Sequence, residues 1–322
     1  MKYKTAYNIM LTTLLCAFLS INSFIFNPIY IVFFIILIFI AMFILISGKI
    51  NIFSLFTIYF ALLFFLFQIL GMYFTDKTVT YVGGINILSP LLMMCSILIS
   101  IGISESINKL KEIDRIKIYK NTFTIAIIFF LIEFTTRLVI GDNNKEFIYK
   151  FKDSLFYFDS NFTGLVIMSM LFLIAYLNIR FNYKSKLNKF IFFMLGTLTF
   201  SRAVIITMLI GSYVFNNKEK YKRRSIFICF SGLTLFLFLV KFYIFNGINY
   251  KLIDNSFNSK FYIIEKIINF YNHQSIGTKL FGIGLGNSEK IIGIFAHNIF
   301  TTFFFEMGVI GSFFLFFIFI YL

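Results

Sequence analysis

The chain has 322 residues, of which 59% are hydrophobic and 13% are charged, and its formal net charge is +15. A soluble domain carries about 25% charged and about 45–50% apolar residues, so this composition excludes a soluble globular protein. In a soluble protein such a positive charge would indicate nucleic-acid binding. Here most Lys and Arg residues lie in short loops between apolar runs, where they indicate membrane topology, and no nucleic-acid partner is expected.

The apolar residues fall in runs of roughly 20 residues, the length that crosses a bilayer as a helix. A helix also satisfies its own backbone groups in lipid. The sequence therefore predicts an all-α, polytopic transmembrane helical bundle of about ten spans, in a single integral membrane domain over residues 1–322. The predicted spans are 6–26, 29–47, 51–73, 81–103, 121–140, 162–179, 190–200, 203–216, 225–245 and 297–322.

Basic residues in short loops set the orientation of the spans. The loops 180–189 and 217–224 are both strongly basic and are both predicted to be cytoplasmic, whereas the net acidic loop 141–160 is predicted to be external. The segment 190–216 must then return to the side that it left, which predicts a hairpin of two short helices meeting at Ser201-Arg202. The alternative is one long span in which the arginine snorkels to the interface.

The ninth span leads into one large external loop, 246–292. In this loop Phe261, Ile264, Ile268 and Tyr271 recur at helical spacing, which predicts an amphipathic helix over about 260–271. Such a helix could lie on the membrane surface or pack as a lid over a site. The three cysteines lie inside apolar runs without metal-ligand spacing, so neither a metal nor a cofactor is expected.

Two arginines, Arg137 and Arg202, map to the outer half of the membrane, where an ionisable side chain is a functional hypothesis by default. Glu133 precedes Arg137 by one helical turn, so a structural ion pair is an equal alternative for Arg137. Arg202 has no acidic residue near it in the sequence. Glu306 lies inside the last span, where we expect an Arg or Lys of another helix as its partner.

His297 begins the last predicted span, directly before Asn298. A histidine at this interface can act as a general base near neutral pH, or can be an ordinary interfacial polar residue. The glycines at 282, 284 and 286 precede it in a GxGxG spacing that is not a dinucleotide fingerprint. They predict a tight turn where the backbone approaches the membrane or a substrate.

Three segments taken together resemble the O-antigen polymerase and O-antigen ligase superfamily, the Wzy-type and WaaL-type enzymes. The first is LTFSRAVIITMLIG at 198–211, which is similar to the Thr-x-Ser-Arg and apolar run of the family. The second is FGIGLGN at 281–287 followed by HNIFTTFFFEMGVIG at 297–311, with a Gly-x-Gly turn, a His-Asn pair and a Glu-x-Gly. The third is FDSNFTG at 158–164, similar to an Asp-x-Asn at the start of a span.

The resemblance implies a metal-independent glycosyltransferase that uses an undecaprenyl-pyrophosphate-linked donor at the outer face of the bacterial cytoplasmic membrane. Arg202 first, then Arg137 and Lys241, would hold the pyrophosphate leaving group. By the same analogy His297 would activate the acceptor hydroxyl or contact the pyrophosphate. Family members often carry a further external arginine, for which Lys241, Lys251 or Lys260 would substitute here. The remaining residues that the resemblance assigns to substrate binding are Asp159, Asn161, Ser201, Gly282, Gly284, Gly286, Asn298 and Glu306.

Polymerase and ligase share these segments and differ in the acceptor, which is another lipid-linked oligosaccharide or the lipopolysaccharide core. We expect a polymerase of O-antigen or capsule, with membrane lipid and lipid-linked oligosaccharides as partners and a chain-length regulator protein as a candidate partner. The alternatives of other classes are a polysaccharide flippase, for which a duplicated half-structure would be typical, and a non-enzymatic assembly partner.

Overall fold

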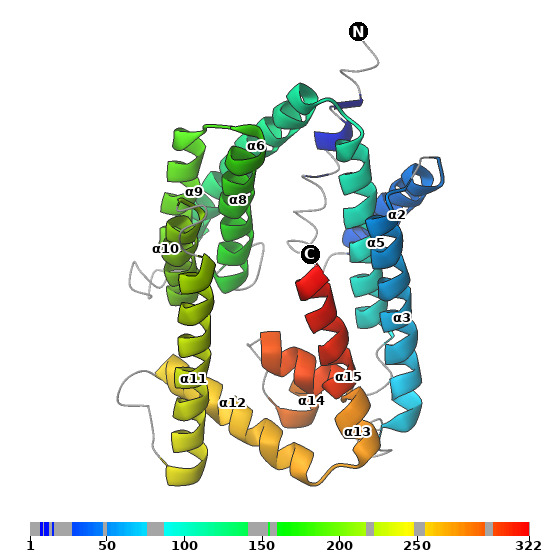
Figure 1. Ribbon diagram of the computed structural model, residues 1–322, viewed down its shortest axis with the longest axis vertical. Helices are drawn as coiled ribbons and strands as arrows, with labels where there is room; N and C mark the ends of the chain where they lie inside the picture. Colours follow the sequence, from blue (N-terminus) through cyan, green and yellow to red (C-terminus); the bar gives the residue numbers. More distant parts are fainter. Residues whose placement is uncertain are drawn as a thin grey trace. The chain divides into compact units, whose positions relative to one another are not determined.

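The structure is a computed structural model. It describes residues 7, 8, 10–12, 15, 28–47, 50–75, 87–140, 154, 160–216, 222–247, 255–293 and 299–321. In this part of the chain every regular element is a helix, in agreement with the predicted all-α class (Figure 1). The helices are α2 (Pro28–Ser47), α3 (Ile52–Phe74), α5 (Leu88–Asn108), α6 (Glu112–Ile140), α8 (Ser160–Phe181), α9 (Lys186–Leu198), α10 (Arg202–Asn216), α11 (Lys222–Asn246), α12 (Asn255–Asn272), α13 (Ile276–Phe281), α14 (Ser288–Ile292) and α15 (Ile299–Tyr321).

Four helices in the described ranges are long and apolar enough to cross a membrane. They cover Ile52–Phe74, Leu88–Asn108, Glu112–Val139 and Ser160–Phe181. Their exposed side chains are largely Leu, Ile and Phe, as in Leu62, Leu66 and Leu70 of α3, and such a surface matches lipid rather than water. The protein is therefore an all-α membrane protein. The orientation and the full number of spans remain predictions.

Two of the predicted spans are too short to cross a bilayer. α9 has 13 residues and α10 has 15. At about 1.5 Å per residue each covers roughly 20 Å, against a hydrocarbon core of about 30 Å. These two helices are consistent with the predicted pair of short helices rather than with two full spans.

The chain divides into two compact units. The first consists of Met1–Gly48 and Gly102–Ile226, and the second of Lys49–Ile101 and Phe227–Leu322. In the first unit α6, α8, α9 and α10 enclose a core of aromatic and aliphatic side chains. Its fully buried members include Phe123, Phe130, Ile167, Leu177, Phe192 and Met208.

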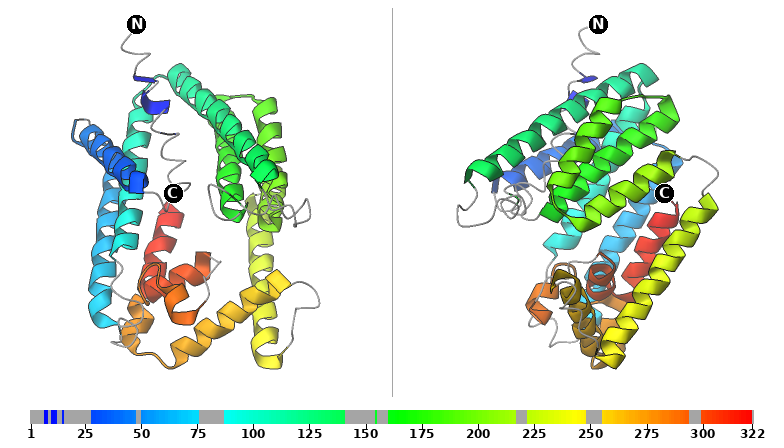
Figure 2. Two further views of the ribbon diagram at one scale, coloured as in Figure 1. Left: turned by 180° about the vertical axis from the view of Figure 1, so that it is seen from behind. Right: turned by 90° about the vertical axis from the view of Figure 1, so that its left-hand side faces the viewer.

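α9 and α10 fold back on one another, as the charges of the flanking loops predict. A Cβ atom on Gly196 of α9 would lie 2.4 Å from Sδ of Met208 in α10, so the two helices are in close contact. A Cβ atom on Gly164 of α8 would likewise lie 2.4 Å from Cγ2 of Val204. Both views of Figure 2 show α8, α9 and α10 side by side. The chain reverses through Phe200, which has φ +51°, a left-handed conformation uncommon for a residue with a side chain.

In the second unit α12 packs on α15 and on residues of the turn after α13 and of α14. Ile263, Ile267 and Tyr271 of α12 are buried together with Phe305 of α15. The predicted apolar face is thus partly wrong, because Ile268 is 38% exposed while Ile263 and Ile267 form the buried face. The helix lies where the amphipathic pattern predicts it, over Asn255–Asn272, and the buried stripe is set by α15 and the turn after α13.

Candidate functional site

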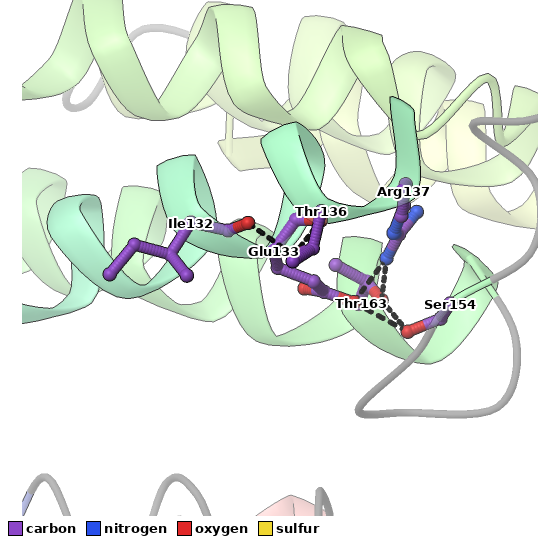
Figure 3. A network of polar contacts seen from close by, with 6 residues as sticks. All are labelled: Ile132, Glu133, Thr136, Arg137, Ser154 and Thr163. Carbon is purple, nitrogen blue, oxygen red and sulfur yellow. Dashed lines mark hydrogen bonds and ion pairs between the residues drawn. The ribbon is translucent and has the colours of Figure 1, made fainter. Parts of the chain in front are cut away.

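Arg137 lies inside a polar network between α6 and α8 (Figure 3). Its side chain is 1% exposed, and Nη2 donates hydrogen bonds to Oε1 of Glu133 and, over 2.8 Å, to Oγ1 of Thr163. The Ser154 hydroxyl donates to the same Glu133 oxygen over 2.6 Å. The Thr163 hydroxyl in turn donates to Oγ of Ser154 over 3.0 Å. The network therefore joins α6, the first turn of α8 and one residue of the segment between them.

The ion pair predicted from the spacing of Glu133 and Arg137 is confirmed. The guanidinium carbon of Arg137 also lies 4.7 Å from the centroid of the Phe134 ring, a cation–π distance. A buried charge is tolerated when it is paired and hydrogen-bonded, as it is here. In this geometry most of the charge of Arg137 is compensated by Glu133, which favours a structural role for the arginine over direct contact with an anionic substrate.

A second polar contact fixes the turn between α9 and α10. The hydroxyl of Ser201 donates a 2.6 Å hydrogen bond to Oδ1 of Asn161, in the first turn of α8. The hydroxyl of Thr199 donates to the Gly196 carbonyl over 2.7 Å, and the Ser201 amide donates to Oγ1 of Thr199 over 3.3 Å. Thr199 is fully buried and Ser201 is 5% exposed. Hydrogen bonds of its own hydroxyl groups and of Asn161 therefore stabilise the conformation of the Thr-Phe-Ser-Arg segment.

Arg202 is the first residue of α10 and is exposed. It follows directly after Ser201, so the bond to Asn161 anchors the backbone from which the arginine side chain extends. The first turn of α8 contributes Asn161 to this turn and Thr163 to the Arg137 network. Three of the predicted site residues, Arg137, Asn161 and Ser201, are therefore brought to one end of α8, and Arg202 directly follows Ser201 in the chain.

The glycines at 282, 284 and 286 form a tight turn, as their spacing predicts. Their φ angles are +79°, +87° and +80°, all in the left-handed region that only glycine adopts easily. The turn faces a break in α15 at Gly308, which has φ +68° and ψ −174°. A Cβ atom on Gly282 would lie 2.4 Å from N of Gly308, so both positions require glycine.

The break in α15 leaves carbonyl groups that accept hydrogen bonds from outside the helix. The amide of Ile283 donates to the Phe305 carbonyl over 3.2 Å, and the amide of Gly284 donates to the Glu306 carbonyl over 2.8 Å. The hydroxyl of Tyr271 in α12 donates to the Phe304 carbonyl over 2.8 Å. Burial raises the pKa of this hydroxyl, which keeps Tyr271 a donor. The turn and α12 therefore satisfy the backbone where the helix is interrupted.

Glu306 binds the same turn through its side chain. Its Oε2 accepts a 2.9 Å hydrogen bond from the Gly286 amide, and Oε1 accepts a 3.3 Å hydrogen bond from the Ser288 amide. The residue is 3% exposed. We expected an Arg or Lys as the partner, but in the described part of the chain the partners are backbone amides. Two backbone amides therefore take the place of the expected cation.

Several predicted site residues are not brought into these two clusters. Lys241 is exposed on α11. His297, Asn298 and Asp159 lie outside the described residues. Within the described ranges no three His, Cys, Asp or Glu side chains are grouped so as to hold a metal ion.

Thr163 and Ser154 were not predicted as site residues, and Gly308 was included only as part of the Glu-x-Gly motif, without a predicted break of the helix. Thr163 and Ser154 are small hydroxyl residues, and nothing in their spacing distinguishes them from others in or near a span. Gly308 carries a weak signal, because a glycine inside a helical pattern makes the helix less stable. No protein-family model, curated protein or solved structure matches the chain.

Proposed function

We propose that the protein is a surface-polysaccharide polymerase. It transfers a growing glycan from polyprenyl pyrophosphate onto a lipid-linked repeat unit at the outer face of the bacterial cytoplasmic membrane. The observation that carries the proposal is the hairpin turn at 199–202, where buried Thr199 and Ser201, bonded to Asn161, present the exposed Arg202. A turn stabilised in this way is typical of a side chain that must be positioned rather than merely solvated.

The chemistry calls for a fixed cation of this kind. Nucleotide sugars are not available outside the cytoplasmic membrane, so the donor must carry its own leaving group. As the glycosidic bond breaks, negative charge develops on the pyrophosphate. An arginine is always protonated and binds phosphate oxygens with two parallel hydrogen bonds. Arg202 also stands at the N-terminus of a helix of 15 residues, where the helix dipole favours an anion.

The two arginines have different roles in this proposal. The charge of Arg137 is compensated by Glu133, so Arg137 positions the start of α8 and, through Asn161, the turn that carries Arg202. Arg202 is the primary contact of the leaving group. His297 activates the acceptor hydroxyl or contacts the pyrophosphate, and Lys241 remains a candidate for a second contact with the donor.

Deletion of the gene in its host tests this function against its alternatives. Loss of a polymerase leaves lipid-linked glycan of a single repeat unit at the outer leaflet. Loss of a ligase leaves long lipid-linked chains that are not transferred to the lipopolysaccharide core. Loss of a flippase leaves single units at the cytoplasmic leaflet. Single units at the outer leaflet support the proposal, and either of the other patterns contradicts it.

A further inference from the structure

The short helix α13 is fixed against the last turn of α3, within the second unit (Figure 1). A Cβ atom on Gly277 of α13 would lie 2.1 Å from the carbonyl oxygen of Phe74, so the two backbones are in close contact. Phe281, at the end of α13, stacks on Phe67 with ring centroids 4.8 Å apart and on Phe74 with centroids 5.1 Å apart. Gly71 leaves room for this ring, because a Cβ atom there would lie 3.0 Å from Cβ of Phe281. The position of α13 is therefore set by the end of α3.

The side chains of α13 are distributed in the opposite way to those of a helix in water. Ile276 and Leu280 are four residues apart and so lie on one face of the helix. Both are exposed, Ile276 to 75%. Thr278, the hydroxyl residue between them, is fully buried, and its amide donates a 3.3 Å hydrogen bond to the Ser275 hydroxyl oxygen. In water the exposed face of a helix is polar and the buried face apolar, so this distribution indicates that the exposed face of α13 meets an apolar medium.

The end of α3 adds two aromatic side chains to this apolar surface. Tyr73 is 82% exposed, and Phe74 is also exposed. Because Phe74 contacts both Gly277 and Phe281, it joins the surface of α3 to that of α13. Tyrosine is enriched where membrane meets water, since its ring is apolar and its hydroxyl group polar. The exposed side chains of Tyr73, Phe74, Ile276 and Leu280 are called the α13 patch below.

The length of α3 gives the depth of the α13 patch in the membrane. The helix has 23 residues, none of which is charged. At about 1.5 Å per residue it is roughly 35 Å long, slightly more than a hydrocarbon core of about 30 Å. The exposed side chains of Leu66, Leu70 and Tyr73 follow one face of the helix, so its lipid-facing surface continues into the last turn. Because α13 packs on that turn, its exposed face lies where the hydrocarbon core meets the lipid headgroups.

We propose that the α13 patch binds membrane phospholipid and is embedded at the boundary between headgroups and acyl chains. Lys279 of the same helix is partly exposed and can extend its ammonium group towards the lipid phosphates, as lysines near a membrane interface do. The glycine turn begins at Gly282, directly after α13, so the patch also holds the start of this turn at the level of the headgroups. The inference goes beyond glycosyl transfer and does not depend on it, because it rests on α3, α13 and their exposed side chains.

Fluorescence quenching tests this proposal directly, because the chain contains no tryptophan and one introduced indole is the only one that emits. The full-length Ile276→Trp variant is reconstituted into vesicles of phosphatidylcholine whose acyl chains carry bromine either just below the headgroup or near the chain end. Bromine below the headgroup should remove most of the emission. Bromine near the chain end, and iodide present on both sides of the membrane, should each remove little. Leu280→Trp places the indole on the same face of α13 and gives an independent reading, also where the first variant fails to fold.

Two further positions of the second unit calibrate the measurement. Leu62→Trp, at an exposed position in the middle of α3, should lose most emission to bromine near the chain end. Glu289→Trp, at an exposed charged position of α14, should lose most emission to iodide. The proposal is overturned if the α13 variants behave like Glu289→Trp, which places the patch in water, or like Leu62→Trp, which places it inside the hydrocarbon core. It is equally overturned if neither bromine nor iodide quenches them, because a protein surface then covers the patch.

Discussion

The hydroxyl of Ser201 and the side-chain oxygen of Asn161 are 2.6 Å apart, although the two residues are separated by 40 positions in the chain. Both lie in segments on which the proposed function rests, at 198–211 and 158–164. The hydrogen bond joins the first turn of α8 to the turn of the α9–α10 hairpin. Arg202 begins α10 at this point, so its backbone is held by a contact that neither segment could make alone.

Arg202→Ala should abolish polymer formation while the protein remains in the membrane. Arg202→Lys should restore little, because an ammonium group cannot reproduce the two parallel hydrogen bonds of a guanidinium. Surface polysaccharide from cells that carry each variant, resolved by chain length on a gel, measures the effect. Arg180→Ala is the matched control, since Arg180 is an exposed arginine at the end of α8 and should leave polymer length unchanged. Wild-type polymer in the Arg202→Ala variant removes Arg202 from the mechanism.

The buried pair of Glu133 and Arg137 should behave as one unit in stability measurements. Arg137→Met leaves a buried carboxylate without its cation, which typically costs about 3–5 kcal/mol. The double variant with Glu133→Gln removes both charges and should be clearly more stable than Arg137→Met alone. Denaturant unfolding in detergent measures both, with Glu112→Gln, at an exposed position of the same helix, as the control. If the losses of unfolding free energy in Arg137→Met and in Glu133→Gln alone add up to the loss in the double variant, the pair is not coupled.

We expect the Glu306 carboxylate to hold the glycine turn in its observed conformation. In Glu306→Gln one of the two amide donors, of Gly286 or Ser288, would face an NH₂ group, at a cost of about 1–3 kcal/mol. A cysteine placed at Leu285 should then react faster with a maleimide, because the turn opens. Glu289→Gln in α14 is the control, since Glu289 is exposed. Equal labelling rates in both variants would show that the carboxylate does not hold the turn.

The orientation of the chain can be measured by cysteine labelling in a variant without its native cysteines. Positions 110, 185 and 221 should be protected from an impermeant reagent in intact cells, and 147 and 255 should react. The reason is the distribution of basic residues, which gather in the loops that stay in the cytoplasm. The α9–α10 hairpin requires 185 and 221 to be on the same side, so labelling of only one of them contradicts the predicted path through the membrane.

Local patterns in the sequence predicted some features of the fold well. The interruption at Ser201-Arg202 was predicted from two basic loops and from the length of the segment between them. In the structure α9 ends at Leu198 and α10 begins at Arg202. The Glu133–Arg137 pair followed from helical spacing alone. Both inferences need only residues that are close in the chain, together with the rule that basic residues gather in cytoplasmic loops.

Features that depend on contacts between distant segments were not predictable in the same way. The partner of Glu306 was expected to be a cation, but the carboxylate binds amides 18 and 20 positions earlier, which no spacing rule identifies. Nor did periodicity alone reveal that Ile263 and Ile267 of α12 would be buried in place of Ile268. That choice depends on where α15 and its break at Gly308 lie.

Reconstitution with purified components tests the central claim, that this membrane protein is a metal-independent glycosyltransferase with a lipid-linked donor. Purified protein given lipid-linked repeat units in detergent should form longer glycans without ATP, nucleotide sugar or added divalent metal, and a chelator should not stop it. His297→Ala should lower the rate by about 100-fold or more if His297 is the general base, whereas a modest loss with weaker donor binding indicates contact with the pyrophosphate. If the pure protein in vesicles moves lipid-linked glycan across the membrane but never lengthens it, the claim is contradicted and the protein is a transporter.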